Sequence, residues 1–135
     1  MQTGPLKLRA QLLCGDEIAM GPGKADLLEA IARTGSISAA GRDLGMSYRR
    51  SWMLVDAMNR CFAQPLVQTI VGGGKERGAR VTPAGEQALA TYRALESRIA
   101  EAVASDLGEL AGMLRAAPLP AGSDPRRDAG EQMPA

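Results

Sequence analysis

The 135-residue sequence predicts an α+β fold, and three observations carry this prediction. Apolar residues recur at helical spacing in several segments, a glycine separates two short ones, and a β-branched stretch with a glycine-rich turn follows. A short helix, a glycine turn, a second helix that begins with two arginines and a glycine-tipped hairpin are the outline of a winged helix-turn-helix. We therefore expect a winged helix-turn-helix with a leading β-hairpin and a long C-terminal dimerisation helix.

A small hairpin is expected at the N-terminus. Residues Leu6 to Leu13 alternate apolar and polar side chains, which is the period of a half-buried strand. Residues 15–17 supply turn chemistry, residues 18–20 can return as a short strand, and Gly21-Pro22-Gly23 ends it.

Apolar spacing and glycine stops indicate the first two helices. Apolar residues recur at helical spacing from residue 24 and Gly35 supplies a stop, so the first helix is expected over residues 24–34. Ser36 or Ser38 can cap the next helix by accepting a backbone N–H bond. Gly45 is expected in the left-handed conformation, because it has no Cβ to clash.

The third helix is expected to run from the N-cap Ser47 to about Phe62. Its inner face, spaced four, three and four, comprises Ser51, Val55, Met58 and Phe62. The other face of its first two turns presents Tyr48, Arg49, Arg50 and Met53. Recognition helices insert this end into the major groove. For Trp52, packing in the core or at its boundary is favoured over a place beside the groove.

A wing is expected after the third helix. Residues 66–71 are strand-like, residues 72–78 form a glycine-rich tip, and residues 79–81 return as a second strand. The glycines followed by Lys75 invite a phosphate-loop interpretation, but that pattern requires Gly at Thr69 and Ser or Thr at Glu76. The basic residues of the hairpin instead indicate a wing.

Thr82 and Pro83 are a good start for the last helix, since Thr can cap it and Pro fits the first helical position. Apolar residues then recur at steps of three and four to about Leu114, and the later part predicts a partner surface. The expected dimerisation residues are Tyr92, Leu95, Ile99, Val103, Leu107 and Leu110. The predicted division is a DNA-binding domain over residues 1–82, a dimerisation helix over 83–115 and a disordered, Pro-rich tail over 116–135.

Charge is concentrated where the helix-turn-helix is expected. The chain has a net charge of +1, but residues 33–82 hold eight basic and three acidic residues, a balance of +5. The segments on either side are each net negative. Binding to the phosphates of duplex DNA requires such a concentration.

The candidate DNA contacts lie on the third helix, the turns before it and the wing: Ser36, Ser38, Ser47, Tyr48, Arg49, Arg50, Lys75, Arg77 and Arg80. An arginine at the start of a recognition helix can fork onto guanine, which is worth about 1–3 kcal/mol of discrimination. Arg49 and Arg50 could instead form a solvated helix face, but DNA contact is favoured for them. For the serines, DNA contact and helix capping carry equal weight.

Other classes of function find little support. The chain has no His, and its two cysteines are too few and too far apart in sequence for a metal quartet, so neither a metal site nor a catalytic constellation is predicted. Cys61 is expected to be a buried small hydrophobe rather than a redox sensor, and Cys14 is left open. Two thiols, no export signal and no apolar run of membrane-spanning length indicate a soluble protein of the reducing cytoplasm.

Several short motifs resemble those of one family. They are Thr34-Gly35-Ser36-Ile37-Ser38, Gly45-Met46-Ser47-Tyr48, Trp52, Met58-Asn59, Leu66-Val67, Gly72-Gly73-Gly74 and Val81-Thr82-Pro83-Ala84-Gly85. Together they resemble the N-terminal DNA-binding domain of the molybdate-responsive regulator (ModE) family, with a looser likeness to LysR-type domains. The resemblance covers about residues 7–92.

The resemblance implies a bacterial, dimeric transcription regulator that binds a palindromic operator, usually as a repressor of molybdate-uptake genes. Full-length members of the family carry C-terminal molybdate-binding domains, which are not visible here, so no molybdate ligand or other cofactor is assigned. Constitutive binding, sensing through a partner and an unidentified effector remain open. Direct molybdate sensing would raise the melting temperature in the presence of the ligand.

The sequence thus predicts a sequence-specific DNA-binding regulator linked to molybdenum metabolism, with repression as its output. It would bind double-stranded DNA at a pseudo-palindromic operator as a homodimer. The alternative is a winged-helix protein-protein interaction module without direct DNA readout.

Overall fold

The computed structural model describes residues 1–70 and 78–123, in two compact units of residues Met1–Val103 and Ala104–Ala135. The predicted wing tip, with Lys75 and Arg77, lies outside the described residues, as does the end of the predicted tail from residue 124 onward. The first unit contains the helix-turn-helix, and it confirms the predicted α+β class.

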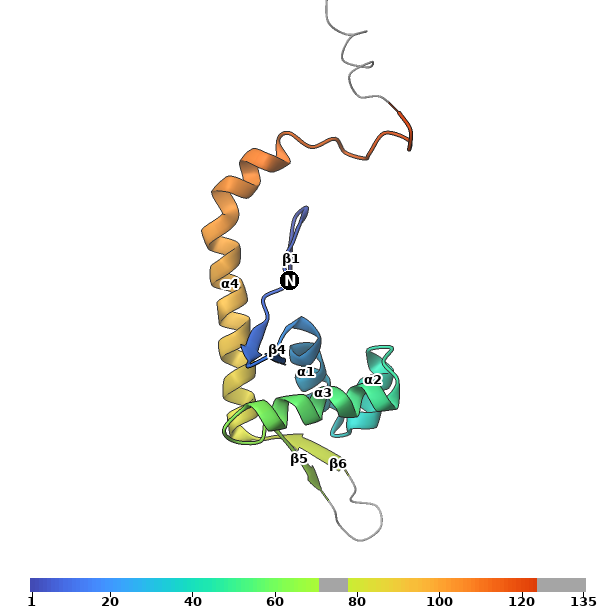
Figure 1. Cartoon of the computed structure of the whole chain (residues 1–135), viewed down its shortest axis with the longest axis vertical. Helices are drawn as coiled ribbons and strands as arrows, with labels where there is room; N and C mark the ends of the chain where they lie inside the picture. The colour runs from blue at the N-terminus through green and yellow to red at the C-terminus, as the bar shows by residue number, and fades with distance from the viewer. Residues whose placement is uncertain (71–77, 124–135) are drawn as a thin grey trace, which may run out of the picture. The chain divides into compact units, whose positions relative to one another are not determined.

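Three helices form the centre of the first unit: α1 (Pro22–Thr34), α2 (Ile37–Asp43) and α3 (Tyr48–Cys61). Helix α1 begins two residues before the predicted start, because Pro22 suits the first helical turn. It ends at Gly35, whose φ of 71° lets its N–H donate to the Ile31 carbonyl oxygen. Figure 1 shows these helices beside the first turns of the last helix, with the wing strands next to them.

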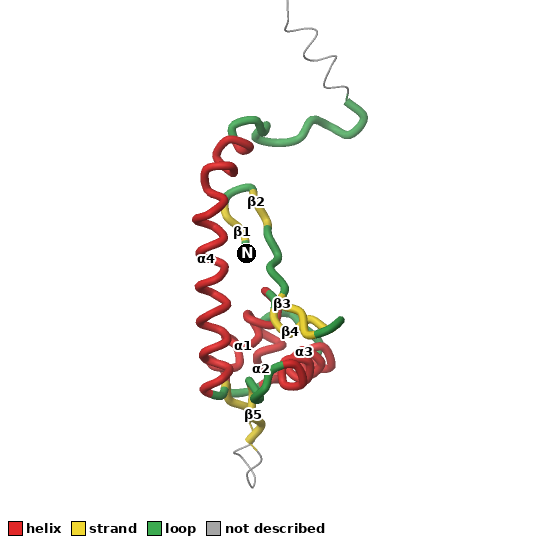
Figure 2. Tube along the Cα trace, turned by 60° about the vertical axis from the view of Figure 1, so that its left-hand side comes forward, coloured by secondary structure: helices red, strands yellow, loops and turns green. Residues whose placement is uncertain are grey.

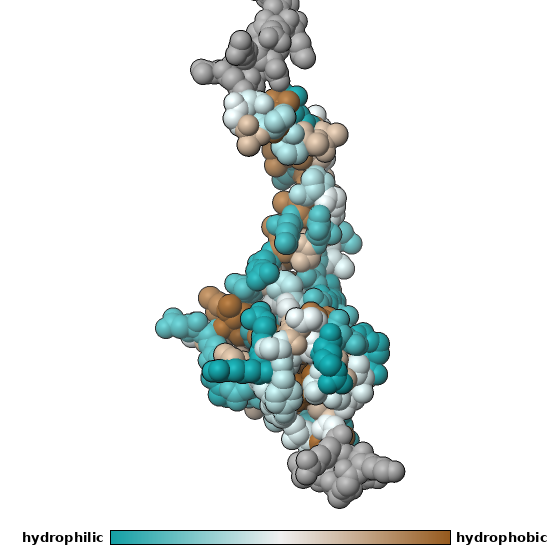
Figure 3. Space-filling model, turned by 90° about the vertical axis from the view of Figure 1, so that its right-hand side faces the viewer, coloured by the Kyte–Doolittle hydropathy of each residue, from teal (hydrophilic) through white to brown (hydrophobic). Residues whose placement is uncertain are grey.

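The core lies between these helices, the wing and the start of the last helix. Its fully buried side chains include Leu27, Leu28 and Ile31 of α1 and Met58 of α3. The predicted inner face of α3 is confirmed, since Ser51, Val55 and Met58 are buried and Phe62 packs against the core. Hydrophilic residues cover most of the face of this unit seen in Figure 3, where apolar residues gather in a limited area.

The wing consists of β5 (Val67–Ile70) and β6 (Gly78–Val81), which pair antiparallel with Val67 opposite Val81 and Ile70 opposite Gly78. The Ala79 N–H donates to the Gly35 carbonyl oxygen at 2.9 Å and thereby ties β6 to the end of α1. A Cβ on Gly78 would lie 2.7 Å from that same oxygen, so the close approach requires glycine.

The predicted single strand over residues 6–13 is wrong, because two short hairpins replace it. Strand β1 (Gln2–Thr3) pairs with β2 (Leu6–Lys7), and β3 (Leu12–Cys14) pairs with β4 (Glu17–Met20). Gly4, with a φ of 56°, makes an early turn that the alternating pattern does not reveal. Between the hairpins, the Ala10 carbonyl oxygen accepts a hydrogen bond from the Tyr92 hydroxyl at 2.8 Å instead of a strand partner. Figure 2 shows this segment running between β2 and β3.

Helix α4 (Pro83–Ala111) begins as predicted and ends three residues before Leu114. The Thr82 hydroxyl caps it by accepting from the Gly85 N–H at 3.0 Å and donates to the Pro65 carbonyl oxygen at 2.6 Å. In the first unit, Ala84, Ala88 and Leu89 pack against the core. In the second unit, residues 104–111 are helical, and turns follow to residue 123. Within the described part of the chain, no helix is long and apolar enough to cross a membrane.

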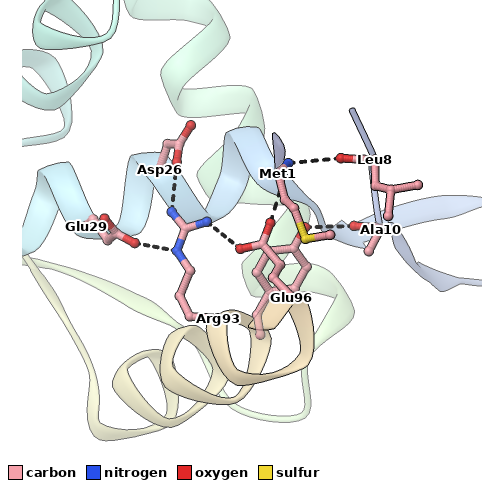
Figure 4. Close-up of polar contacts among 8 residues, drawn as sticks. Met1, Leu8, Ala10, Asp26, Glu29, Arg93 and Glu96 are labelled. Atoms are coloured by element: carbon pink, nitrogen blue, oxygen red, sulfur yellow. Dashed lines mark hydrogen bonds and ion pairs between the residues drawn. The ribbon is translucent and has the colours of Figure 1, made fainter. Parts of the chain in front are cut away.

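A charged cluster joins α4 to α1 and to the N-terminus (Figure 4). The Arg93 guanidinium donates to Asp26 at 2.8 Å, to Glu29 at 2.5 Å and to Glu96 at 2.8 Å. The Met1 ammonium group lies 3.7 Å from Glu96, which is largely buried, and donates to the Leu8 carbonyl oxygen. These contacts hold the part of α4 around Arg93 and Glu96 against α1 and the N-terminus.

Candidate nucleic-acid interface

Two serine caps and one glycine shape the helix-turn-helix: Ser36 caps the start of α2, and Gly45 and Ser47 form the turn that leads into α3. The Ser36 hydroxyl accepts from the Ala39 N–H at 3.1 Å, and the Ser47 hydroxyl accepts from the Arg50 N–H at 3.1 Å. Gly45 has a φ of 69°, which confirms the predicted left-handed turn. The prediction that either Ser36 or Ser38 caps α2 is therefore settled in favour of Ser36.

The angle between α2 and α3 depends on a contact between two small residues. Ser51 is completely buried against Gly41, and a Cβ on Gly41 would clash with the Ser51 hydroxyl oxygen. That hydroxyl donates to the Ser47 carbonyl oxygen at 3.0 Å and is therefore satisfied within its own helix. The close contact lets α3 lie directly on α2 while its opposite face stays uncovered.

The uncovered face of α3 carries aromatic, apolar and cationic side chains. Tyr48 is 62% exposed, Met53 59% and Trp52 37%, and Arg49 and Arg50 are exposed too. The Tyr48 and Trp52 rings meet edge to face, with centroids 6.1 Å apart. The side chains of Tyr48, Arg49, Trp52, Met53 and Asp56 line a shallow hollow. Of the two places favoured for Trp52, the core and its boundary, the core is excluded, because Trp52 is 37% exposed and is not part of the buried cluster.

The charges on α3 differ between its two ends. Among the described residues, neither Arg49 nor Arg50 forms an ion pair. At the other end, Arg60 contacts Asp56 at 2.7 Å and Glu17 at 2.5 Å. Hydrogen bonds to these carboxylates raise the pKa of Arg60 and keep it protonated. Positive charge that forms no ion pair among the described residues is therefore found at the start of α3, which also carries the positive end of the helix dipole.

The remaining predicted contact residues occupy different settings. Ser38 accepts a hydrogen bond from Arg42 at 3.2 Å on the exposed side of α2. Arg80 is exposed on β6 and donates to the Gln68 side chain across the strand pair at 2.9 and 3.2 Å. Lys75 and Arg77 belong to the undescribed tip.

Asn59 holds the wing against α3, a role that the sequence analysis did not identify. Its side-chain oxygen accepts from the Leu66 N–H at 2.8 Å and the Val67 N–H at 3.2 Å, and its amide donates to the Val67 carbonyl oxygen at 3.0 Å. A polar residue on an otherwise apolar helix face, eight residues before a strand, was the signal that could have indicated it. Asn59 therefore couples the two elements that carry the candidate contacts.

The predicted dimerisation residues divide into three groups. Tyr92 is only 6% exposed, belongs to the core and bonds Ala10, so its side chain is already occupied within the chain. Leu95 is 46% exposed, and Ile99 and Val103 are half-buried in the first unit. In the second unit, Leu110 is 61% exposed and Leu107 is half-buried.

A largely apolar groove of about 810 Å³ lies beside α4 in the first unit. Its lining includes Leu12, Met20, Phe62, Leu66, Ala88 and Leu95. Leu12 and its neighbour Leu13 are more than half exposed. No group of three His, Cys, Asp or Glu side chains that could hold a metal ion is found in the described ranges.

The helix-turn-helix and its wing have the architecture of a winged helix-turn-helix module. Residues 24–86 match the family described as "Bacterial regulatory helix-turn-helix protein, lysR family". The match begins in α1 and ends in the first turn of α4, so it contains every element of the interface.

Three curated proteins share sequence with the N-terminal part of this chain. The molybdenum-pterin-binding protein MopB of Rhodobacter capsulatus is 48% identical over 86 residues, which cover 64% of this chain and 32% of the relative. The molybdenum transport protein ModE of Herbaspirillum seropedicae is 39% identical over 95 residues, covering 66% and 35%. The DNA-binding transcriptional dual regulator ModE of Escherichia coli K12 is 35% identical over 71 residues, covering 53% and 27%.

The N-terminal part of this chain is thus similar to ModE and Mop proteins and carries a LysR-type helix-turn-helix, which confirms the resemblance found in the sequence. The matched segment spans about a third of the length of these relatives.

Proposed function

We propose that this chain is a sequence-specific, DNA-binding transcription regulator of molybdenum metabolism that acts as a homodimer. The observation that carries the proposal is the start of α3, where Arg49 and Arg50 are exposed and form no ion pair among the described residues. The similarity of the module to ModE proteins supports the link to transcription and to molybdenum.

Helix α3 enters the major groove by its first two turns. Arg49 and Arg50 read guanine edges or clamp phosphates, and Tyr48 contacts the sugar-phosphate backbone. Met53 and the exposed edge of Trp52 add apolar surface that suits a thymine methyl group. The backbone N–H groups at the start of α3 favour a phosphate at the same place.

The wing and the neighbouring turns contact the flanking DNA backbone. Arg80 lies on β6, and Lys75 and Arg77 follow from the sequence of the tip. Ser36 and Ser47 already accept a backbone N–H bond each, but a serine hydroxyl can still donate its proton to a phosphate oxygen. Ser38 is available in the same way.

Dimerisation uses the apolar side of α4, with Leu95, Ile99 and Val103 in the first unit and Leu107 and Leu110 in the second. Tyr92 supports this face from within the core. The exposed leucines of β3 and the groove beside α4 add apolar surface in the first unit that a second copy can cover. Two recognition helices would then read half-sites about 34 Å apart on a pseudo-palindrome.

The test uses a duplex that the protein itself selects from a random library. Affinity is measured by fluorescence anisotropy at several salt concentrations for the parent chain and for the Arg49→Ala/Arg50→Ala double variant. Each phosphate contact contributes a slope of about −0.9 in log K against log salt. We expect the double variant to lose at least tenfold in affinity, and its slope to be shallower by up to about 2 if both arginines contact phosphates.

The control variant is Arg9→Ala, which removes an exposed positive charge outside the helix-turn-helix. It should bind the selected duplex nearly as the parent does. Equal losses of affinity in the two variants would mean that only the overall charge of the protein matters. Unchanged binding by the double variant would contradict groove reading by α3. A chain that selects no duplex would support a protein-protein interaction module instead.

Dimerisation and the regulated genes need separate measurements. We expect sedimentation to give a dimer that Leu95→Glu converts to monomers, because the substitution places a charge on the apolar side of α4. Mapping of bound sites in the genome should place them beside genes of molybdenum uptake or use, with repression of those genes. Sites scattered without such neighbours would contradict the molybdenum link alone.

A further inference from the structure

The two cysteines of the chain, which 46 residues separate in sequence, lie on elements that come together in the fold, because β4 packs against both β3 and α3. Cys14 is the last residue of β3 and pairs with Glu17, the first residue of β4, across a tight turn at Gly15. Residues directly opposite each other in an antiparallel pair point to the same face of the hairpin. The side chains of Cys14 and Glu17 therefore emerge on the same side.

Glu17 connects this side of the hairpin to the end of α3. Its two carboxylate oxygens accept hydrogen bonds from the Arg60 guanidinium at 2.5 and 2.8 Å. Cys61 follows Arg60 and is the last residue of α3. Strand β4 also packs against α3, so the ion pair is part of a continuous contact.

The raised pKa of the Cys61 thiol agrees with this placement. Burial raises the pKa of the Cys61 thiol most strongly, and the neighbouring Cys14, as hydrogen-bond acceptor and by its charge, raises it further. Glu17 also raises the pKa of Cys61, whereas Arg60 opposes the increase. Lys24, whose pKa is lowered by burial, also lies within electrostatic reach of Cys61 and Glu17. The two cysteines thus lie near each other beside a small charged cluster.

We propose that Cys14 and Cys61 are a redox-active pair that forms a reversible intramolecular disulfide on reaction with a peroxide. Cys14 is exposed and Cys61 is half-buried, so Cys14 is the thiol that meets the oxidant. The Cys14 thiolate attacks one peroxide oxygen, the O–O bond breaks, and a sulfenic acid and hydroxide form. The Cys61 thiolate then attacks the sulfenic sulfur, and the S–O bond breaks as the S–S bond forms.

The electrons and atoms balance in this sequence. Two thiols lose two electrons and two protons, and one molecule of hydrogen peroxide is reduced to two molecules of water. A small dithiol reverses the reaction by exchange through a mixed disulfide.

The sequence alone favoured a separate, inert role for Cys61, because it gave no sign that the strand and the helix end would meet.

The disulfide would fasten the β3–β4 hairpin to the end of α3. Closing a loop of this length restricts the unfolded chain, so oxidation should raise the melting temperature by about 5–15 °C. The proposal does not depend on DNA binding, because its measurements use the protein alone.

The test treats the full chain, reduced beforehand, with hydrogen peroxide. We expect the intact mass to fall by about 2 Da, both thiols to become unreactive together, and non-reducing peptide mapping to find Cys14 joined to Cys61 in a monomeric chain. Dithiothreitol should restore both thiols and the original melting temperature.

The Cys14→Ser and Cys61→Ser variants show whether the two thiols act together. Each should lack the 2 Da loss and the rise in melting temperature, and Cys61→Ser should accumulate a sulfenic acid at Cys14 that a dimedone probe captures. Disulfides between chains, independent oxidation of each cysteine to sulfinic acid, or two thiols that stay reactive would each overturn the proposal.

Discussion

Replacing Asn59 with Ala should loosen the wing from the recognition helix and destabilise the first unit. The substitution removes three hydrogen bonds, of 2.8, 3.0 and 3.2 Å, between α3 and the start of the wing. Their backbone partners belong to Leu66 and Val67, which are 1% and 3% exposed. Water therefore has little access to the N–H and C=O groups that the substitution leaves unpaired.

The expected loss in unfolding free energy follows from this geometry. Three hydrogen bonds at about 1 kcal/mol each, together with a partial penalty for the unpaired buried groups, give about 3–4 kcal/mol. Alanine recovers roughly 0.6 kcal/mol through its higher helix propensity. A net loss of about 3 kcal/mol corresponds to a fall in melting temperature of about 10–15 °C for a unit of this size.

Circular dichroism against temperature and urea gives the free energy, and hydrogen exchange gives the location. The amides of Leu66 and Val67 should exchange faster in Asn59→Ala than the amides in α1. The matched control is Met53→Ala, which truncates an exposed residue on the same helix and should change stability by less than about 0.5 kcal/mol. An Asn59→Ala chain that melts within about 2 °C of the parent would refute the argument that this side chain attaches the wing.

Two further substitutions test the charged contacts. Arg93→Met removes the shared partner of Asp26, Glu29 and the largely buried Glu96, and should lower the free energy of unfolding by about 2 kcal/mol. Its control, Arg33→Met, breaks one exposed pair with Asp43 and should lower it by less than about 0.5 kcal/mol. Equal losses in urea unfolding would contradict the assigned role of the cluster. A hydrogen bond from Arg60 lowers the pKa of Glu17 below its ordinary value of 4.5, so its contribution to stability is present above that value and is lost as pH falls through the lowered pKa. Glu17→Gln should therefore melt below the parent at pH 7 and close to it at pH 3, and a difference that persists at pH 3 would assign the effect to packing.

The sequence predicted the helix-turn-helix well because its signals are local. Gly35 and Gly45 both adopt the left-handed conformation that marks the ends of helical segments, and Ser47 caps α3 as its position suggests. The four-three-four spacing from Ser51 to Phe62 identified the buried side of α3, because residues three or four positions apart lie on the same face of an α-helix. The leading strand was predicted less well, since an alternating pattern cannot show that backbone groups of residues 8–11 form hydrogen bonds outside a strand pair, as the Ala10 carbonyl oxygen does with Tyr92.

The sequence predicted which residues of the candidate site are exposed, but not the contacts that hold the site in place. The exposed positions of Tyr48, Arg49 and Arg50 followed from helical phase alone. The pairing of Arg60 with Glu17, 43 residues earlier, and the attachment of Asn59 to the wing are long-range contacts that no local pattern contains. The same limit explains why the meeting of the two cysteines was missed.

The arrangement of acids around α3 makes its charge directional. Asp56 and Glu17 both contact Arg60 at the C-terminal end, and no described acid contacts the arginines at the N-terminal end. Because the helix dipole also makes the N-terminal end positive, the field of the helix is strongest where the groove is proposed to lie. The low net charge of the chain is consistent with DNA binding for this reason: acidic residues neutralise the arginine that fastens α3 to the hairpin and leave the pair at its start without a protein partner. Binding then depends on where the positive charge is placed in the fold, more than on its total.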